Sequence, residues 1–144
     1  MNMKLWKIDI VIWNLKLLIE HMMNIRIVDM MIEEIYDTIA ERLASSLKPY
    51  NKIVTLGSSN PRFDYEALSG IIKPYGLSIR FIGNGISYYT SYIDKIYVKD
   101  DTVSIHTRNS IYQYKLLDSK DNEYKVVFEL TNSEREHIEE SIRG

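Results

Sequence analysis

Residue types that commonly carry catalysis are scarce and scattered in this sequence. The 144-residue chain has no cysteine, which excludes a cysteine nucleophile, a disulfide framework and zinc sites built on thiolates. Its three histidines, His21, His106 and His137, stand far apart and lack metal-site spacings such as HExxH. No GxSxG elbow surrounds a serine. The sequence therefore favours a protein that is not an enzyme and that holds neither a metal nor a cofactor.

One fragment is similar to part of a nuclease site. Glu123 and Lys125 form an ExK pair on a predicted strand, and restriction-type nucleases combine such a pair with an acid on the neighbouring strand to hold Mg²⁺. In the predicted pairing the neighbouring positions are Lys115 and Leu117, which supply no acid. A hidden nuclease site at Glu123 and Lys125 stays an alternative.

A Gly/Ser loop is a second candidate site, formed by Gly57, Ser58, Ser59 and Asn60. It follows a predicted strand at 52–56, and Asn60 is expected to cap a helix that starts at Pro61. Backbone amides of such a loop at a helix N-terminus are suitable donors to a phosphate. The loop is therefore predicted to bind an anion. The alternative is a capped surface loop without a ligand, since caps of this composition are common.

The segment Thr55-Leu56-Gly57-Ser58-Ser59 resembles the first strand and loop of the CRISPR-associated Rossmann-fold domains that bind cyclic oligoadenylates. The resemblance covers five residues of 144. It implies a nucleotide ligand at this loop. No second motif of that family follows in the chain, so the sequence is not assigned to it.

Basic residues and tyrosines alternate with apolar residues through the second half of the chain. One face of a predicted sheet then carries the candidate nucleic-acid-binding residues Arg80, Tyr89, Lys95, Tyr97, Lys99, His106, Arg108, Lys115 and Lys125. Cations neutralise phosphates, and rings stack on bases with about 1–3 kcal/mol for each stack. The pattern therefore predicts a platform for single-stranded nucleic acid.

Two other interpretations of this face stay open. Solvated sheet faces often carry Lys, Arg, Thr and Tyr because these residues suit strands, and lysine discourages edge aggregation. The formal net charge of −2 and the pI near 5.9 also fall short of a basic footprint. Ile111 and Val127 on the same face fit a protein partner or a homodimer instead.

The sheet itself is predicted as an antiparallel meander from about 77 to 130. Its strongest signal is Asn84-Gly85, because Asn-Gly between alternating apolar runs favours a two-residue type I′ hairpin, which pairs Phe81 with Tyr88. The opposite face is predicted as the core side, and its members after the first hairpin are Ile96, Val98, Val103, Ile105, Tyr112, Tyr114, Leu116, Tyr124, Val126, Phe128 and Leu130.

Three further turns complete the predicted meander. A turn at Asp100-Asp101 pairs Val98 with Val103, and a turn at Asn109-Ser110 pairs Thr107 with Tyr112. The last turn falls within 118–122 and delivers a final strand beside the preceding one.

Three amphipathic helices are predicted around this sheet. The first covers 28–47 and ends before Pro49, the second runs from Pro61 to about residue 72, and the third covers the tail from Thr131. The tail has a predicted capping box between Ser133 and Glu136. The expected fold is α+β, with a mixed, mostly antiparallel sheet and helices packed on one face.

Residues 1–24 are predicted as an N-terminal extension, a strand leading into a short helix, before a single domain at 25–144. Met22 and Met23 suggest an alternative start, which would make the extension dispensable. Scattered charges leave no apolar run of the roughly 18 residues that a transmembrane helix needs. An amphipathic helix lying on a membrane surface stays an alternative.

Composition is that of an ordinary folded domain, with 45% hydrophobic and 26% charged residues. A cytoplasmic location is expected. The absence of cysteine, together with Gln113 as the one glutamine, fits a thermophile, and an archaeal or archaeal-virus source is the hypothesis.

Overall fold

The computed structural model describes the backbone of residues 3–118 and 121–143 and the side chains of residues 11–24, 30–118 and 121–142. The chain divides into two compact units, residues 1–35 and 36–144. One helix, α1 (Met3–Leu47), belongs to both units.

The first unit is helical throughout its described residues, so the predicted strand within residues 1–24 is wrong. A half-buried strand would leave alternate positions polar, but Val11 and Trp13 occupy such positions here. Apolar residues thus occur on several sides of the segment, and the pattern fits a helix as well as it fits a strand. None of the helices in the described part of the chain combines the length and apolar character needed to cross a bilayer.

In the second unit the last turns of α1 bury an apolar stripe. Ile39, Leu43 and Leu47 are all almost fully buried, as the helical spacing of the sequence predicts. The α-helix ends at Leu47, and Pro49 lies in the short 3-10 helix η1 (Lys48–Tyr50) that follows. The predicted end of this helix is confirmed.

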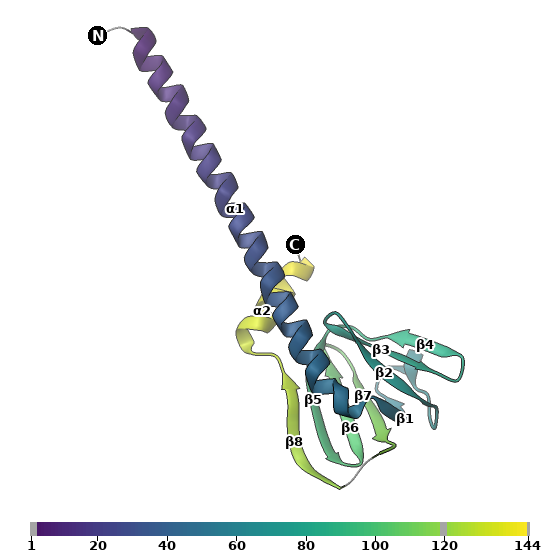
Figure 1. The fold of residues 1–144 in the computed structure, drawn as a ribbon. Helices are drawn as coiled ribbons and strands as arrows, with labels where there is room; N and C mark the ends of the chain where they lie inside the picture. Colours follow the sequence, from purple (N-terminus) through teal and green to yellow (C-terminus); the bar gives the residue numbers. More distant parts are fainter. Residues whose placement is uncertain (1–2, 119–120, 144) are drawn as a thin grey trace. The chain divides into compact units, whose positions relative to one another are not determined.

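The second unit is built on an eight-stranded sheet in the order β4-β3-β2-β1-β7-β6-β5-β8 (Figure 1). The described pairings are antiparallel, which confirms the predicted α+β class. The strands are β1 (Lys52–Ser58), β2 (Ser69–Tyr75), β3 (Ser78–Gly83), β4 (Ile86–Tyr89), β5 (Ile93–Asp100), β6 (Thr102–Thr107), β7 (Ile111–Leu116) and β8 (Asn122–Glu129).

The strand order corrects the predicted meander at its end. β8 pairs with β5 rather than with β7, whose free side is taken by β1. Strands β5 to β8 therefore lie in the order β8-β5-β6-β7, which is a Greek-key arrangement. The connection that makes this return was predicted as a turn within 118–122, and its middle lies outside the described residues.

Two of the predicted turns are confirmed with their register. Phe81 pairs with Tyr88 around Asn84 and Gly85, both of which have positive φ. Val98 pairs with Val103 around Asp100, which also has positive φ.

The register beyond the turn near Asn109 differs from the prediction by two residues. Ile105, not Thr107, stands opposite Tyr112. The turn is longer because Thr107 closes it, with its backbone N–H donating to the Ser110 carbonyl at 2.9 Å. A shift of two residues leaves every side chain on its predicted face.

The predicted helix from Pro61 to residue 72 is wrong. Asn60 does accept a hydrogen bond from the Arg62 amide through its side chain, but the cap starts only the 3-10 helix η2 (Pro61–Phe63). The chain then enters β2, which pairs with β1 on one side and β3 on the other. Backbone hydrogen bonds to a strand on each side outweigh the local helix signal.

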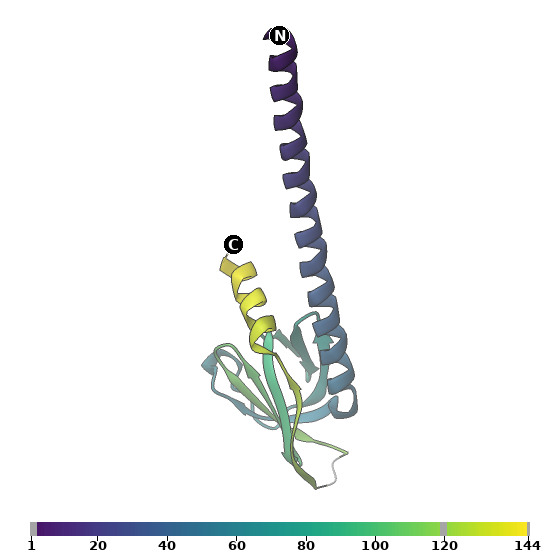
Figure 2. The same ribbon diagram turned by 90° about the vertical axis from the view of Figure 1, so that its left-hand side faces the viewer.

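The sheet is so strongly curved that strands distant in its order meet inside (Figure 2). The Tyr88 hydroxyl of β4 and the Tyr114 hydroxyl of β7 are 2.8 Å apart, although three strands separate β4 from β7. The Phe81 ring stacks on both tyrosines, with centroids at 5.0 and 6.3 Å. This aromatic layer fills the core between the β3–β4 hairpin and β7.

Bulges in the β5–β8 ladder change the predicted face of β8. Ile96 stands opposite Phe128, but the next residue, Tyr97, stands opposite Val126. Val127 is therefore the extra residue of a bulge. Tyr124 and Val126, predicted in the core, are 55% and 41% exposed.

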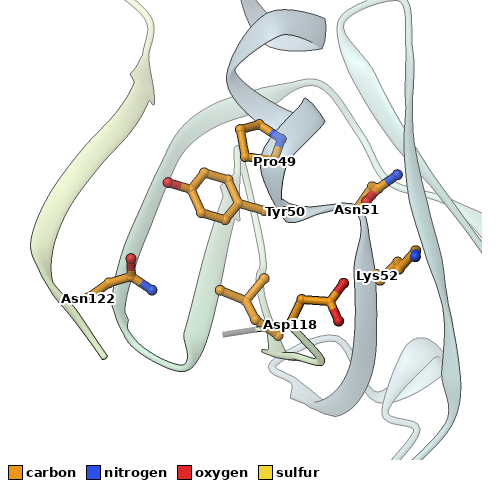
Figure 3. Close-up of a pocket in the computed structure, with 7 residues that line it drawn as sticks. Pro49, Tyr50, Asn51, Lys52, Asp118 and Asn122 are labelled. Atoms are coloured by element: carbon orange, nitrogen blue, oxygen red, sulfur yellow. The ribbon is translucent and has the colours of Figure 1, made fainter. Parts of the chain in front are cut away.

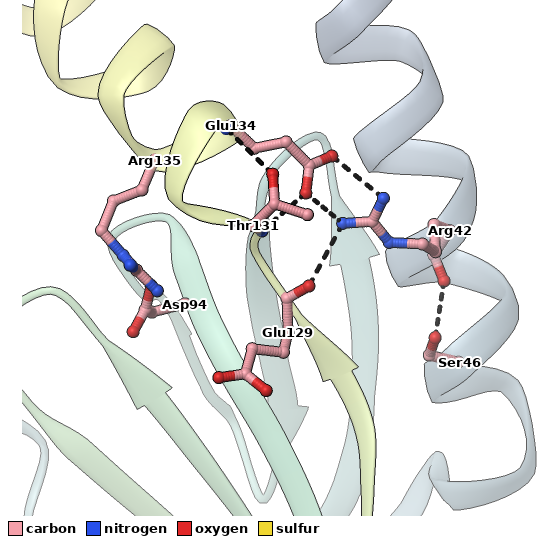
Figure 4. Close-up of polar contacts among 7 residues, drawn as sticks. All are labelled: Arg42, Ser46, Asp94, Glu129, Thr131, Glu134 and Arg135. Atoms are coloured by element: carbon pink, nitrogen blue, oxygen red, sulfur yellow. Dashed lines mark hydrogen bonds and ion pairs between the residues drawn. The ribbon is translucent and has the colours of Figure 1, made fainter.

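The C-terminal helix α2 (Asn132–Arg143) follows β8 and is held by ion pairs (Figure 4). The Arg42 guanidinium donates two hydrogen bonds to the Glu134 carboxylate, and Arg135 Nε donates to Asp94 at 2.7 Å. The capping box joins Thr131 and Glu134, not Ser133 and Glu136 as predicted, because the helix is capped two residues earlier than expected.

Candidate nucleic-acid interface

One side of strands β8, β5, β6 and β7 carries predicted basic and aromatic residues and is here named the outer face; one of its members, Ser104, is buried, at 3% exposure. The cross-strand rows of this face are Glu129, Lys95, His106 and Ile111; then Val126, Tyr97, Ser104 and Gln113; then Lys99, Thr102 and Lys115. Five of the nine sequence-predicted residues, Lys95, Tyr97, Lys99, His106 and Lys115, thus share one face. The register of neighbouring strands sets them side by side.

An aromatic and basic cluster occupies the β8 side of this face. The Tyr97 ring lies 5.3 Å from the Tyr124 ring and 5.3 Å from the His106 ring, measured between centroids. Lys95 Nζ lies 5.8 Å from the Tyr97 centroid, a cation–π distance. Tyr124 belongs to this cluster because the β8 bulge brings its side chain to the outer face.

The surroundings of His106 favour its neutral form by lowering its pKa. Partial burial lowers its pKa below the usual 6.5, the nearby Lys95 charge lowers it further, and Asp94 opposes them. The Nε2 atom is buried without a hydrogen-bond partner. The ring at neutral pH therefore serves as an aromatic surface beside Tyr97 rather than as a positive charge.

The two lysines at the far end of the face differ in their surroundings. Lys99 is exposed beside the Asp100 turn. Lys115 Nζ lies 3.7 Å from an Asp101 carboxylate oxygen, and both side chains are about half exposed. An exposed pair of this length is weak and opens at little cost, so both ammonium groups are accessible to a phosphate.

Two predicted residues are not in the site. Arg108 follows β6 and pairs with Glu139 of α2, its Nη1 lying 3.3 Å from the carboxylate. Lys125 stands opposite the buried Val98, and its Nζ lies 5.8 Å from the ring of Tyr50. The bulge that brings Tyr124 to the outer face removes Lys125 from it.

The remaining two predicted residues form a separate cluster on the β3–β4 hairpin. The Arg80 guanidinium lies 5.3 Å from the Tyr89 centroid and donates to Ser87 Oγ at 3.0 Å. The Tyr75 ring of β2 lies 4.7 Å from that of Tyr89. This second exposed pair of tyrosines repeats the chemistry of the first on another part of the sheet.

The backbone N–H groups of Ser58, Ser59 and Asn60 in the Gly/Ser loop all donate hydrogen bonds within the protein. Ser58 N–H donates to the Asp64 carboxylate at 3.2 Å, Ser59 N–H to the Ile111 carbonyl, and Asn60 N–H to Ser58 Oγ. Asp64 also lines the pocket of about 380 Å³ beside Gly57. An acid at this point disfavours an anion, and β1 has antiparallel neighbours on both sides, unlike the parallel sheet of a Rossmann fold.

The ExK pair of β8 lies beside β5 and not beside β7, where the sequence placed it. Val98 stands opposite Lys125, and Asp100 stands opposite Asn122, the residue before Glu123. Within the described residues no group of three His, Asp or Glu side chains is arranged to hold a metal ion.

A pocket of about 230 Å³ was not foreseen from the sequence (Figure 3). It is lined by Pro49, Tyr50, Asn51, Lys52, Leu116, Asp118 and Asn122. These residues come from three segments, 49–52, 116–118 and 122, which lie far apart in the sequence or on different strands. Its lining contains one basic residue, Lys52, and one acidic residue, Asp118, and this pair does not indicate a particular class of ligand.

Tyr124 and Val126 are outer-face residues that the sequence missed. Strict alternation assigns both to the core with Phe128, and only the bulge at Val127 reverses that assignment.

Comparisons with protein-family models, curated proteins and solved structures found no match for this chain.

Proposed function

We propose that the protein is a non-enzymatic binding protein whose outer face takes single-stranded nucleic acid. The observation that carries the proposal is the Tyr97–Tyr124 ring pair with Lys95 beside it. Rings on an open sheet supply stacking surfaces for bases, and neighbouring ammonium groups neutralise phosphates.

The charge on the face sets the expected strength and salt dependence. Lys95, Lys99 and Lys115 are opposed by Asp101 and Glu129 on or beside the same surface. Binding is therefore expected to be weak at physiological salt. Each phosphate contact to a single strand should add about 0.7 to the slope of log affinity against log salt concentration.

A titration of labelled single-stranded oligonucleotide with the full chain at low salt tests the proposal. The double variant Lys95→Ala, Lys99→Ala should weaken binding and reduce the salt slope. Lys125→Ala is the matched control, because this lysine lies on β8 but not on the outer face, and it should change neither. Undetectable binding at low salt, or equal effects of the double variant and the control, would contradict the proposal.

A protein partner at the same face is the second candidate, because Ile111 and Val126 are 39% and 41% exposed on it. An Ile111→Lys, Val126→Lys variant separates the two functions. It should strengthen the binding of nucleic acid but abolish a complex with a protein partner or a homodimer formed through this face, observed by light scattering.

The expected cytoplasmic location and the hot-environment archaeal or archaeal-virus source are part of the same proposal. A melting midpoint below about 60 °C, ordinary for mesophile domains, would contradict the thermophile assignment.

A further inference from the structure

The first unit exposes apolar side chains on several sides of α1, among them Ile12, Trp13 and Leu17, and one row of them is here named the stripe. The side chains of Val11, Leu15, Leu18 and Met22 are each more than half exposed. Their intervals of four, three and four residues alternate in the manner of a heptad repeat, the pattern of a helix packed along another helix. The same spacing continues at Ile39 and Leu43, which the second unit buries.

We propose that this stripe pairs with the same stripe of a second copy of the chain, with the two helices antiparallel. In the proposed register Val11 of one copy lies against Met22 of the other, and Leu15 lies against Leu18. Each apolar side chain then fills a layer with one from the second copy. The pairing is independent of the outer face and of the proposed nucleic-acid binding.

The residues beside the stripe favour the antiparallel direction. Ile12 and Ile19 border it on one side, and Asn14 and His21 border it on the other. Antiparallel helices bring like borders together, so Ile12 meets Ile19 and Asn14 meets His21. Parallel helices bring opposite borders together, which would set Asn14 against Ile19 and leave a polar group in an apolar seam.

Charge complementarity in the sequence selects the same register. The heptad positions of the stripe hold a charged residue at two places before residue 30, Lys4 and Asp29. The register that pairs Val11 with Met22 also sets Lys4 opposite Asp29 of the second copy. A parallel pair would instead set lysine against lysine and aspartate against aspartate, which is unfavourable in an apolar seam.

Engineered cysteines test the direction and register directly, because the natural chain has none. Full-length Val11→Cys and Met22→Cys chains, mixed and oxidised, should form a mixed disulfide dimer. Val11→Cys alone should not, since its two copies would lie about 16 Å apart along the helix. Self-linking of Val11→Cys without the mixed product would show parallel helices and overturn the proposal.

Light scattering of the full chain tests the association itself. Leu15→Asp, Leu18→Asp should abolish the dimer, whereas Leu17→Asp, an exposed leucine off the stripe, should retain it. Lys4→Asp and Asp29→Lys should each weaken the dimer, and the two together should restore it. A parent chain that stays a monomer at every concentration would overturn the proposal. So would a parent chain that binds phosphatidylglycerol vesicles as a monomer.

Discussion

Arg42 and Glu134 form a two-point ion pair, with guanidinium-to-carboxylate distances of 2.9 and 2.7 Å (Figure 4). Arg42 lies on the last turns of α1 and Glu134 on the first turn of α2, so the pair joins segments 92 residues apart. The same guanidinium donates to the Glu129 carbonyl and lies 5.2 Å from the Phe128 centroid. One side chain thus fixes α2 against the end of β8.

Replacing Glu134 by alanine should lower the free energy of unfolding by about 1–2 kcal/mol. The substitution removes the ion pair and also the capping contact with Thr131, and lost caps alone typically cost about 1 kcal/mol. Glu136→Ala is the matched control, because Glu136 is exposed on the same helix. Urea unfolding of both variants measures the difference, and equal destabilisation would contradict the assigned cap.

The same carboxylate predicts an acid limb of stability. The hydrogen bond from Arg42 is the largest cause that lowers the Glu134 pKa below its ordinary 4.5, and partial burial opposes it. Because the folded-state pKa is lowered, the stabilisation is present above about pH 4.5 and is lost as the pH falls through the folded value. Glu134→Gln should therefore flatten the fall in melting midpoint below that pH. An unchanged acid limb would show that other carboxylates control it.

Local signals predicted two of the turns with their register. Asn84, Gly85 and Asp100 all adopt positive φ, a requirement that Asn, Gly and Asp meet at low cost. Alternation also assigned the faces of β5, β6 and β7, and it survived a two-residue register error because the side-chain period is two.

Strand pairings between segments distant in the sequence could not be predicted from local patterns. Nothing in Ser69–Tyr75 indicates that β1 and β3 will accept it as a strand, and Asn60-Pro61 argues locally for a helix. The position of β8 beside β5 depends on how the chain returns across the sheet. Its bulge then decides that Tyr124 is in the candidate site and Lys125 is not, which alternation alone cannot show.

Replacing Tyr88 by phenylalanine should cost about 1–3 kcal/mol, because it leaves the buried Tyr114 hydroxyl without its partner at 2.8 Å. Phe81, which stacks in the same layer, stays in place. The double variant Tyr88→Phe, Tyr114→Phe is the control and should recover part of the loss, since no buried hydroxyl is then unpaired. Thermal unfolding of the three chains decides this.

The same pair predicts an alkaline limb. Burial is the main cause that raises the pKa of Tyr88 to about 12 and that of Tyr114 well above 10. A raised folded-state pKa means that the stabilisation is complete below about pH 10 and is lost as the pH rises toward 12. The pKa of Tyr92 is also raised to about 12, mainly by burial, so three tyrosines should stay protonated near pH 11. Absorbance titration near that pH should therefore show about three fewer phenolates in the folded chain than in the unfolded chain. Ionisation of all tyrosines near pH 10 would contradict the buried pair.

A substitution of Tyr124 on the outer face distinguishes an effect on base stacking from an effect on the stability of the fold. Its ring is 55% exposed and lies 5.3 Å from Tyr97, so Tyr124→Ala should leave the unfolding free energy within about 0.5 kcal/mol of the parent. Loss of one base stack should weaken oligonucleotide binding by about 5- to 150-fold, the equivalent of 1–3 kcal/mol. Tyr124→Phe keeps the ring and should retain the affinity. Tyr75→Ala, an exposed tyrosine in the other cluster, shows whether a base stacks there as well. An unchanged affinity in Tyr124→Ala would remove the ring pair from the interface.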